Sequence, residues 1–451
     1  MSPTRTLAAL RFGCGLPVAD GSPDSPDTML AALAGPDKMA EIWPIMGLAE
    51  SRPLFLAFRA IKGEGKQDPA LAAKREALLL QIGAQAQQAQ RATFARAVDA
   101  RDGFRERLVA FWADHFSVVA ASATATIYPF ALVEDAIRPN LTGNFATLLT
   151  DVTLHPAMLT YLDQISSVGP NSQLGKKQHK GLNENLAREV IELHSLGVGA
   201  GYSQQDVTEM AKLLTGLVVD PADGTQFEAR RAEPGAKRIM GKTYDGDGLA
   251  PIKAALADLA LRPETAAHIA RKLVVHFVAD APDAALVNRI ATAYSASGGS
   301  LMACYASLLS DPAAWHPAPQ KARQPYDFLI ASLRALGITG QTLQDMPYKH
   351  FKARFLDTMA RMGQPFKRPP GPNGFAEAAE EWITPQGLAR RITWAMQVPD
   401  RLVNPLPDPV ELAQRCLADR ASEALLWAAA KAEDRQQGVG LVLASAEFNR
   451  R

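Results

Sequence analysis

The segment NENLAREVIELHSLGVGAGYSQQDVTEMAKLLTG constrains the fold most, because its polar and apolar side chains recur with the period of an α-helix. Asn183 begins this segment and is a suitable cap for a first helix. A glycine-rich turn ends that helix. Ser203 and Asp206 then have the spacing of a capping box that opens a second helix over residues 204–215. The sequence therefore predicts a helical hairpin, and its second helix is expected to bury Val207, Met210, Ala211 and Leu214.

Each predicted helix carries two acidic side chains three residues apart, a spacing that places them on one helical face. The first helix carries Glu189 and Glu192, and the second carries Asp206 and Glu209. Charged groups are costly to bury unless something pairs with them. A helical hairpin brings the two pairs face to face, so this segment is predicted to form either a structural polar network or a functional site.

Two histidines, His115 and His155, are candidates to join these carboxylates. His115 continues the apolar stripe of RERLVAFWADHFSV, and His155 stands before Pro156, a residue type that suits the first position of a helix. His194 follows Glu192 by two residues and therefore lies on a different helical face. The candidate catalytic residues are Glu189, Glu192, His155, His115, Asn185 and Arg188, and the candidate metal ligands are Asp206, Glu209 and His194.

Two kinds of function fit this set of residues. In the first, the protein is an enzyme whose carboxylates hold a divalent metal ion such as Mg, Mn, Fe or Zn, or act as general acid and base while a histidine relays protons. In the second, the buried network fixes the helix register, and the protein is a non-catalytic scaffold that binds a small molecule or another protein. We expect Glu189 and Glu192 to be buried and engaged with Arg188, Asn185 or a histidine. The pattern leaves open whether the chain is an enzyme.

Most of the 451-residue chain is a succession of predicted helices, which indicates an all-α (mainly helical) globular protein. The character changes where Pro, Gly and Asp separate short runs, and a small β-hairpin is expected near residues 222–247 from the pairing of TQFEARR with AKRIMGKTY. The length exceeds that of a usual single core. The predicted domains are an N-terminal helical subdomain over residues 1–219 that carries the polar segment, a β and loop excursion over residues 220–248, and a C-terminal helical subdomain over residues 249–451.

Composition argues against several classes of protein. Lys and Arg total 48 and Asp and Glu total 47, and a net charge of +1 argues against a nucleic-acid partner held by bulk electrostatics. No apolar run approaches the length of about 18 residues that a membrane span needs. Cys14, Cys304 and Cys416 lie far apart and give neither a zinc-binding spacing nor a disulfide framework, so free thiols are expected. Arg11 interrupts the apolar run near the N-terminus, and the direct interpretation is a cytoplasmic protein.

Several ordered motifs along the whole chain resemble those of one bacterial family. They are AALRFGCG, FWADHFSV, LHPAMLTYLD, SSVGPNSQLG, the helical-hairpin segment, ARKLVVHFVADAP, PPGPNGF with EEWITPQGLARR, and LASAEFNRR. Together they resemble the domain of unknown function 1800 family. The resemblance implies a mainly helical protein whose biochemical role is not established. It also implies that export to the periplasm is common among members and that a sulfatase-like partner protein is often encoded nearby.

The chain departs from the family pattern where members often carry histidines. Ala232 and Glu233 stand where a His-Asp pair is common, and Arg262 with Pro263 stands where His-Pro is common. Ala113 occupies a place where some members have a second histidine. If the chemistry of the family uses those histidines, this member is altered in activity. If it does not, the carboxylates of the helical hairpin are the stronger candidates.

Overall fold

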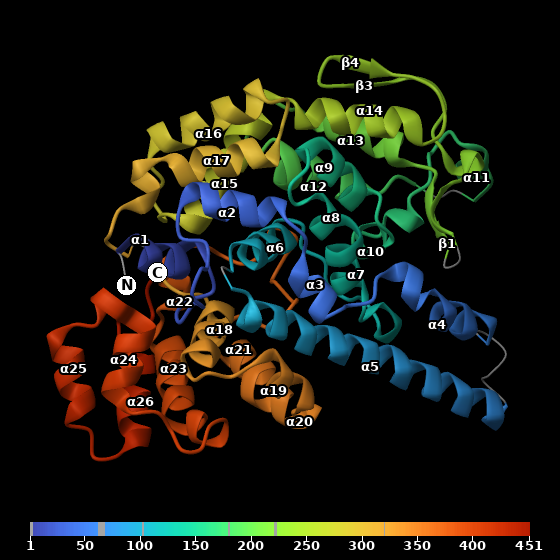
Figure 1. Ribbon diagram of the computed structural model, residues 1–451. Coiled ribbons are helices and arrows are strands. Elements are labelled where there is room, and N and C mark those ends of the chain that lie inside the picture. The colour runs from blue at the N-terminus through green and yellow to red at the C-terminus, as the bar shows by residue number, and fades with distance from the viewer. Residues whose placement is uncertain (1–2, 62–67, 102, 179–180, 221–222, 320) are drawn as a thin grey trace.

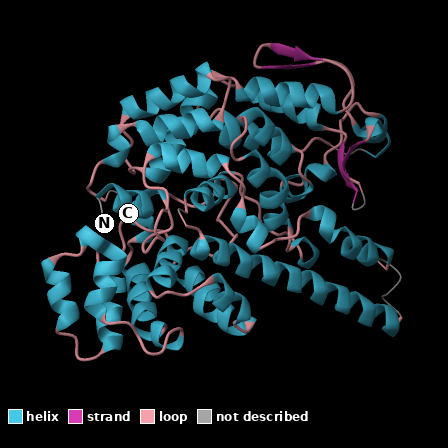
Figure 2. Ribbon diagram, in the orientation of Figure 1, coloured by secondary structure: helices cyan, strands magenta, loops and turns pink. Residues whose placement is uncertain are grey.

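Helices make up 64% of the chain, and the only strands among the described residues form two short hairpins (Figure 2). The computed structural model describes residues 3–61, 68–101, 103–178, 181–220, 223–319 and 321–451. The prediction of a mainly helical protein with a small β excursion is confirmed. None of the described helices combines the length and the apolar character needed to cross a bilayer.

The N-terminal half contains one long helix, which α3, α4 and α6 contact, and a series of shorter helices. The long helix, α5, is rich in Ala, Leu, Gln and Arg, which favour helix formation. The helices are α1 (Pro3–Leu7), α2 (Pro26–Ala34), α3 (Lys38–Ile42), α4 (Leu48–Ala60), α5 (Pro69–Asp99), α6 (Phe104–His115), α7 (Tyr128–Leu132), α8 (Arg138–Asn140), α9 (Phe145–Thr153), α10 (Pro156–Tyr161), α11 (Gln173–Gln178), α12 (Asn185–Glu189) and α13 (Gln204–Leu214). A π-helical turn over Val190–Ser195 continues α12.

The predicted helical hairpin is present as α12 and α13. The Asn183 side chain accepts a hydrogen bond from the backbone N–H of Asn185, and Ser203 with Asp206 forms the expected capping box at the start of α13. Gly197 follows the π-helical turn with a positive φ of 91°. The four apolar residues expected in the core on α13 are all fully buried. Local sequence therefore determines this part of the fold.

The β excursion consists of two hairpins rather than one. Strand β1 (Leu217–Asp220) pairs antiparallel with β2 (Gly224–Phe227), and β3 (Lys237–Ile239) pairs antiparallel with β4 (Lys242–Tyr244). The expected pairing of TQFEARR with AKRIMGKTY is therefore wrong in detail. The start of TQFEARR instead pairs with the preceding strand β1, and AKRIMGKTY folds back on itself as β3 and β4, because a short connection closes a hairpin at a smaller entropic cost. Residues 221–222, inside the excursion, lie outside the described residues.

The C-terminal half is again helical. Its helices are α14 (Leu249–Ala260), α15 (Pro263–Phe277), α16 (Ala284–Ala296), α17 (Leu301–Ser310), α18 (Pro325–Ala335), α19 (Gly340–Asp345), α20 (Tyr348–Phe351), α21 (Asp357–Arg361), α22 (Ala379–Trp382), α23 (Pro385–Gln397), α24 (Pro409–Leu417), α25 (Glu423–Ala430) and α26 (Arg435–Ala444). The three cysteines are unpaired, as expected, and all three are buried.

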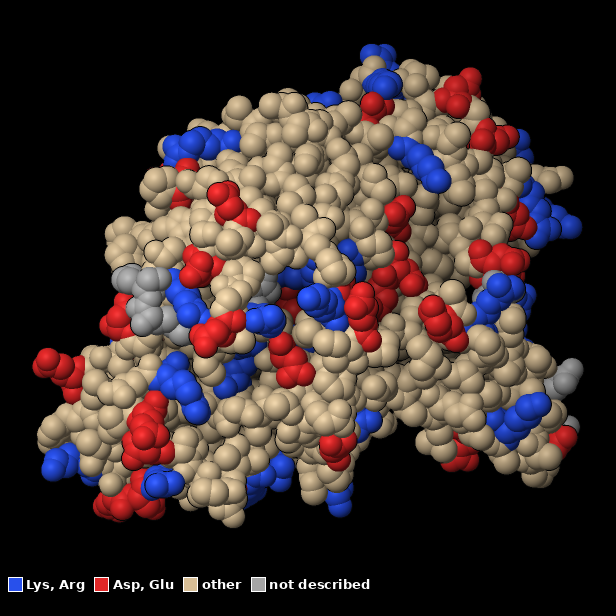
Figure 3. All heavy atoms as spheres, in the orientation of Figure 1, with Lys and Arg blue, Asp and Glu red and all other residues tan. Residues whose placement is uncertain are grey.

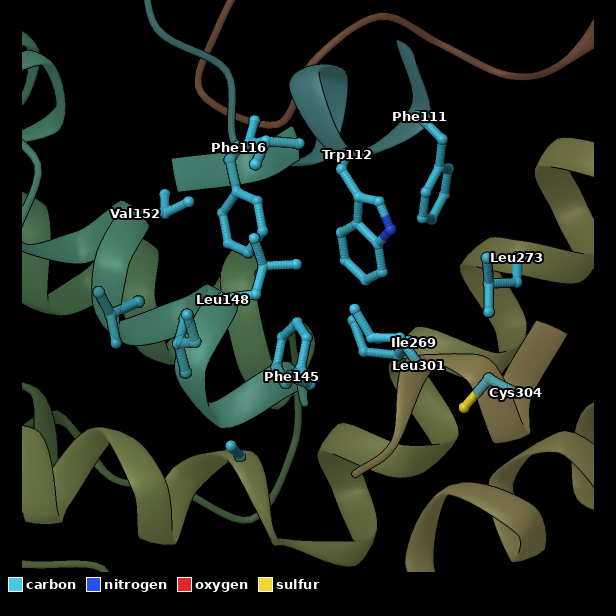
Figure 4. Packing of buried hydrophobic residues seen from close by; sticks show 14 of the residues in the cluster. Phe111, Trp112, Phe116, Phe145, Leu148, Val152, Ile269, Leu273, Leu301 and Cys304 are labelled. Carbon is cyan, nitrogen blue, oxygen red and sulfur yellow. The ribbon is translucent and has the colours of Figure 1, made fainter. Parts of the chain in front are cut away.

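Two large hydrophobic cores and two small clusters support these helices (Figure 1). The larger core joins α6, α9, α12 and α13 with α14 to α17, and it surrounds Trp112, whose indole N–H donates to the Tyr305 hydroxyl at 2.7 Å (Figure 4). The second core joins the C-terminal part of α5 with α18, α23, α24 and α26. The larger core thus draws on both sides of the β excursion. The division into subdomains at residues 220–248 stays a prediction.

Charged side chains lie where the two cores meet. On the face seen in Figure 3, Lys, Arg, Asp and Glu side chains gather across the middle of the molecule, where α3, α6 and α18 lie in Figure 1. Beneath this surface, Arg107 on α6 forms an ion pair with Asp327 on α18 at 2.5 Å. Asp327 forms a second ion pair with Arg451 at 3.3 Å. These three side chains are buried or nearly so. Ion pairs therefore connect the larger core to the second core.

Candidate functional site

The predicted carboxylates of the helical hairpin lie at its surface. Arg188 pairs with Glu184 at 3.2 Å and with Glu192 at 3.1 Å. Glu189 is half-buried and makes no hydrogen bond or ion pair with any described residue; burial and the neighbouring Glu192 raise its pKa. Asn185 is exposed. The expected engagement with Arg188 therefore holds for Glu192 but not for Glu189.

The two acidic pairs face different neighbours. The link between α12 and α13 is made by Glu184, which accepts hydrogen bonds from Thr208 at 2.6 Å and from Gln204 at 2.8 Å. Asp206 instead accepts from the backbone N–H of Met240 at 2.6 Å. Glu209 pairs with Lys212 and lies against the same hairpin, β3–β4. The structure does not bring the pairs on α12 and α13 face to face, because the second β-hairpin packs over α13.

His155 lies away from these carboxylates and has a capping role. Its Nδ1 accepts the backbone N–H of Ala157 at 3.1 Å, and its Nε2 lies 3.2 Å from Asp135. Pro156 occupies the first position of α10, as the sequence predicts. The observed contacts of His155 are those of a helix cap held by a nearby carboxylate.

His115 and His194 belong to a buried cluster of imidazoles that also includes His268. The ring centroid of His115 lies 6.1 Å from that of His194 and 6.1 Å from that of His268. His115 Nε2 lies 3.2 Å from the His194 carbonyl oxygen, whereas neither ring nitrogen of His194 meets a partner among the described residues. Burial lowers the pKa of all three, to about 3 for His194 and about 4 for His268. The cluster is therefore neutral at physiological pH.

The three candidate metal ligands are not brought together. Asp206 and Glu209 face the β3–β4 hairpin, and His194 lies in the core against Phe116, with ring centroids 5.1 Å apart. Across the described ranges, no group of three or more His, Cys, Asp or Glu side chains has an arrangement that could hold a metal ion. The i, i+3 spacing placed each acidic pair on one face of its helix, but the turn of the hairpin determined what that face meets.

A different group of charged residues lines a cavity of about 120 Å³ at the junction of the two cores. Its walls come from segments far apart in sequence: α5, α6, α7, the π-helical turn after α7, α15, α18, α21 and the loop over residues 363–377. The ionisable residues that line it are Arg96, Glu106, Arg107, Asp114, Glu134, Arg138, Asp327, Lys367, Glu377 and His276. A cavity with several convergent ionisable groups is the usual form of a ligand site.

Most of these charges are paired with one another. Arg96 makes two hydrogen bonds to Glu134, at 2.6 and 3.0 Å. Arg138 meets Glu106 at 2.5 and 2.7 Å. Such bidentate pairs compensate the cost of burying both charges. The cavity walls are thus rigid and electrically balanced on the side of α5 and α6.

A chain of contacts balances the opposite wall. Arg107 lies 3.2 Å from His276, whose other ring nitrogen lies 2.5 Å from Glu377. Glu377 also meets Lys321 at 3.1 Å. Burial alone would raise the pKa of Glu377, but His276, Lys321 and Arg451 together hold it below its ordinary value. This wall therefore keeps its carboxylate ionised.

Asp114 and Lys367 are the two exceptions in the cavity. Asp114 accepts hydrogen bonds only from the backbone N–H of Phe375, at 3.0 and 3.1 Å, and Lys367 has no hydrogen-bond or ion-pair partner among the described residues. Burial raises the pKa of Asp114 to about 7; Glu377 acts in the same direction, and the Phe375 N–H and the nearby Lys272 and Lys367 cations only partly oppose it. Burial lowers the pKa of Lys367 to about 8. Both groups thus titrate close to neutral pH.

The loop over residues 363–377 holds both groups in place. At Gly374, which has a φ of 79°, an added β-carbon would lie 2.5 Å from an Asp114 carboxylate oxygen, so only glycine allows this approach. Lys367 itself adopts a left-handed backbone with a φ of 55°. Such a conformation costs a non-glycine residue about 1–2 kcal/mol. The proline-rich loop therefore accepts local strain to place Lys367 at the cavity.

The sequence offered only a weak signal for this site. Asp114 precedes His115 in FWADHF, but one acidic residue on an amphipathic helix has no pattern that distinguishes it. Lys367 precedes the proline-rich run RPPGPNGF, which indicates an irregular loop and not what the loop covers. The motif resemblance was the stronger signal, because FWADHFSV, ARKLVVHFVADAP and PPGPNGF all contribute residues to the cavity walls.

Comparison with known proteins identifies a family and no function. A family model described as a protein of unknown function (DUF1800) matches residues 21–450, nearly the whole chain. Neither a curated protein nor a solved structure shows significant similarity to the chain.

Proposed function

The chain belongs to the DUF1800 family of proteins of unknown function, and for this member we propose that the junction cavity binds a small polar molecule and exchanges protons with it through Asp114 and Lys367. In this proposal the protein is an enzyme of the acid–base class. The carboxylate and histidine chemistry expected from the sequence moves from the helical hairpin to the junction of the two cores.

One observation carries this proposal: the cavity holds two unpaired ionisable groups among otherwise paired ones. Asp114 and Lys367 are half-buried, and a partly desolvated charge without an ion-pair partner is costly, so these two groups, unlike the paired wall charges, add no stability. General acid–base catalysis works best when the pKa of the catalytic group lies near the operating pH. Asp114, whose pKa is raised to about 7, and Lys367, whose pKa is lowered to about 8, both meet that condition.

The size of the cavity limits the ligand. A cavity of about 150 Å³ in another protein accommodates benzene, and this cavity measures about 120 Å³. A ligand of roughly six non-hydrogen atoms therefore fits without rearrangement of the walls. Apolar residues among the lining, such as Val109, Phe130 and Met359, would contact its carbon atoms.

The test is Asp114→Asn, with the exposed Asp400→Asn as the matched control. The folded-state pKa of Asp114 is raised, so its contribution to stability is present at low pH and is lost as pH rises through about 7. Asparagine does not ionise, so it removes this pH-dependent loss of stability. Its amide oxygen can still accept the hydrogen bond from the Phe375 N–H. We expect Asp114→Asn to unfold at the same or a higher temperature than wild type at pH 8, and to lose one proton titration between pH 6 and 8.

A potentiometric titration of folded wild type and both variants measures that proton directly. Wild type and Asp400→Asn should share the titration near pH 7, and Asp114→Asn should lack it. If all three proteins titrate alike between pH 6 and 8, Asp114 is not an acid–base group of the kind proposed.

A second candidate function concerns the polar network of the helical hairpin. The contacts of Glu184 with Thr208 and Gln204, and those of Arg188 with Glu184 and Glu192, connect α12 to α13. These contacts support the proposal that the network is structural and fixes the register of the two helices. The competing proposal is a divalent cation or acid–base site at Glu189 and Glu192, favoured by the unpaired, raised-pKa carboxyl of Glu189.

A further inference from the structure

We propose that Lys367 captures a small aldehyde or ketone in the junction cavity as an imine, with Asp114 as the proton donor and acceptor of the step. The inference rests on the proposed function of the cavity and names the substrate class: a carbonyl compound of about six non-hydrogen atoms. It also assigns Lys367 a covalent role that an ion-pairing lysine does not have.

The position of Lys367 supports a nucleophilic role. Carboxylates hold the cavity cations Arg96, Arg107 and Arg138, but Lys367, which lines the same cavity, has no such partner in the part of the chain that the structure describes. Its left-handed backbone shows that the loop holds this side chain at a cost. An anchoring cation would be satisfied by the nearby Glu134, yet the structure records no ion pair between them within 4.0 Å.

The free amine is the reactive form, and the cavity favours it. Burial is the largest influence on Lys367, and Asp114 and Glu134 only partly offset it. A shift from 10.5 to about 8 increases the fraction of free amine at pH 7 by roughly 300-fold. Lysines that form imines with carbonyl substrates are activated by this kind of desolvation.

Imine formation needs only the Lys367 amine, the carbonyl compound and the proton of Asp114. The Lys367 nitrogen attacks the carbonyl carbon, the C=O π bond breaks, and a proton moves from nitrogen to oxygen to give a carbinolamine. The protonated Asp114 carboxyl then donates a proton to the hydroxyl as the C–O bond breaks, and the nitrogen lone pair forms the C=N bond. One water leaves, a protonated imine remains, and the Asp114 carboxylate is its counter-ion. No oxidation or reduction takes place.

The remaining walls suit such a product. Val118, Phe130, Val133 and Phe366 line the same cavity, and such apolar walls would disfavour the water that hydrolyses an imine. The ion pairs on the wall of α5 and α6 fix Arg96 and Arg138, so neither is free to neutralise Asp114. The cavity thus combines a nucleophile, a proton shuttle and a water-poor surface.

The experiment is reductive trapping in the full-length native protein at pH 7. Sodium cyanoborohydride reduces an imine to a stable secondary amine, and the carbonyl probes are acetaldehyde, glycolaldehyde, glyoxylate, acetone and pyruvate. Peptide mapping by mass spectrometry follows each lysine over time. With at least one probe, we expect Lys367 to be modified at least about tenfold faster than the exposed Lys431, because about a tenth of its amine is unprotonated at pH 7, far more than at an exposed lysine, and a proton donor lines the same cavity.

Two variants make the result specific. Lys367→Arg keeps the positive charge and should remove the fast adduct while the other lysines react as before. Asp114→Asn should slow the modification of Lys367 by at least about tenfold, since general acid–base catalysis typically contributes 10²–10⁴-fold. Circular dichroism and thermal melting of each variant show that it is folded.

The outcomes separate this inference from the function on which it rests. If Lys367 reacts no faster than Lys431 with any of the five probes, imine capture is wrong. The pH 6 to 8 titration of Asp114 is measured without a carbonyl compound, so its presence would leave the acid–base proposal standing. If Lys367 reacts fast and Asp114→Asn does not change the rate, Lys367 is the nucleophile and the assignment of Asp114 is overturned.

Discussion

The two charged regions of this protein differ in what surrounds them. In the helical hairpin, Arg188 and Glu192 form an ion pair whose side chains are 38% and 20% exposed. At the junction of the cores, Arg107 and Asp327 form an ion pair whose side chains are 4% and 12% exposed. Water screens the first pair and leaves the second pair unscreened. The same residue types therefore have opposite consequences in the two places.

The comparison also explains which region can carry chemistry. On the helical hairpin, Glu189 is half-buried and has no ion-pair partner among the described residues, and burial together with Glu192 raises its pKa. In the cavity, the unpaired Asp114 and Lys367 shift toward neutral pH because water cannot stabilise their charged forms fully. The pKa shifts in the cavity are larger than that of Glu189, and they bring both groups near neutral pH.

The largest effect is expected from a variant that breaks the buried ion pair between Arg107 and Asp327. Asp327→Asn removes the partner of both Arg107 and Arg451, whose guanidinium groups would stay buried without a compensating charge. We expect a loss of about 3–5 kcal/mol of unfolding free energy. The matched surface change, Arg188→Gln, should cost less than about 1 kcal/mol. Urea denaturation of the two variants beside wild type measures both values.

The pH dependence of the Asp327 effect is a further check. The Arg107 and Arg451 guanidinium groups outweigh burial and hold the pKa of Asp327 at about 2. Its contribution is therefore present above about pH 4 and is lost only as pH falls toward 2. Equal losses for Asp327→Asn and Arg188→Gln at pH 7 would contradict the distinction between the two regions.

The second effect concerns the buried imidazoles. The folded-state pKa of His194 is about 3, below its ordinary value of 6.5, so the unfolded chain binds the proton first as pH falls. Stability is complete above pH 6.5 and decreases below it, by about 2 kcal/mol at pH 5 for this one group. His194→Leu keeps an apolar side chain in the core and removes the titration. Thermal melts between pH 4.5 and 7.5 should show a smaller acid-induced loss than in wild type.

The same variant bears on the predicted metal ligand. If His194 binds a metal ion, the stabilisation of wild type by added Zn²⁺ or Mn²⁺ should disappear in His194→Leu. The structure places the ring in the core. We therefore expect that neither protein changes its own melting temperature when these ions are added. An undiminished acid-induced loss in the variant would show that His194 is not one of the groups responsible.

The smallest effect is expected from Glu189→Gln. Glu189 has no ion-pair partner among the described residues, and burial and the adjacent Glu192 raise its pKa. Removal of its charge should leave the unfolding free energy within about 0.5 kcal/mol of wild type. Thermal melts with and without Mg²⁺, Mn²⁺ and Zn²⁺ test the alternative. A wild-type melting temperature that rises with a cation and a variant that does not respond would establish a cation site on α12 and replace the structural interpretation.

Local sequence predicted the parts of the fold that depend on neighbouring residues. The capping box at Ser203 and the start of α10 at Pro156 were both found as expected, because each involves contacts within a few residues. The helices α2, α3 and α4 were not indicated, and the β excursion paired differently. Long-range packing contributes to these elements, and its effect is not visible in the local pattern.

For the candidate site too, spacing predicted what depends on near neighbours and not what depends on long-range packing. Spacing correctly placed Glu189 with Glu192 and Asp206 with Glu209 on their helices, but it could not determine that the β3–β4 hairpin would cover the second pair. It also could not bring together Asp114 and Lys367, which are separated by about 250 positions in the chain. Only the packing of distant segments gives these two side chains a common environment.

The sequence by itself determined the helical class, the family and the positions of the caps, because these depend on periodicity and on contacts between near neighbours. Tertiary structure alone decided which charges are buried, which are paired and which two remain unpaired in a cavity. The physical reason is that burial and dielectric environment are properties of everything that surrounds a group, whereas the sequence specifies only what is adjacent along the chain.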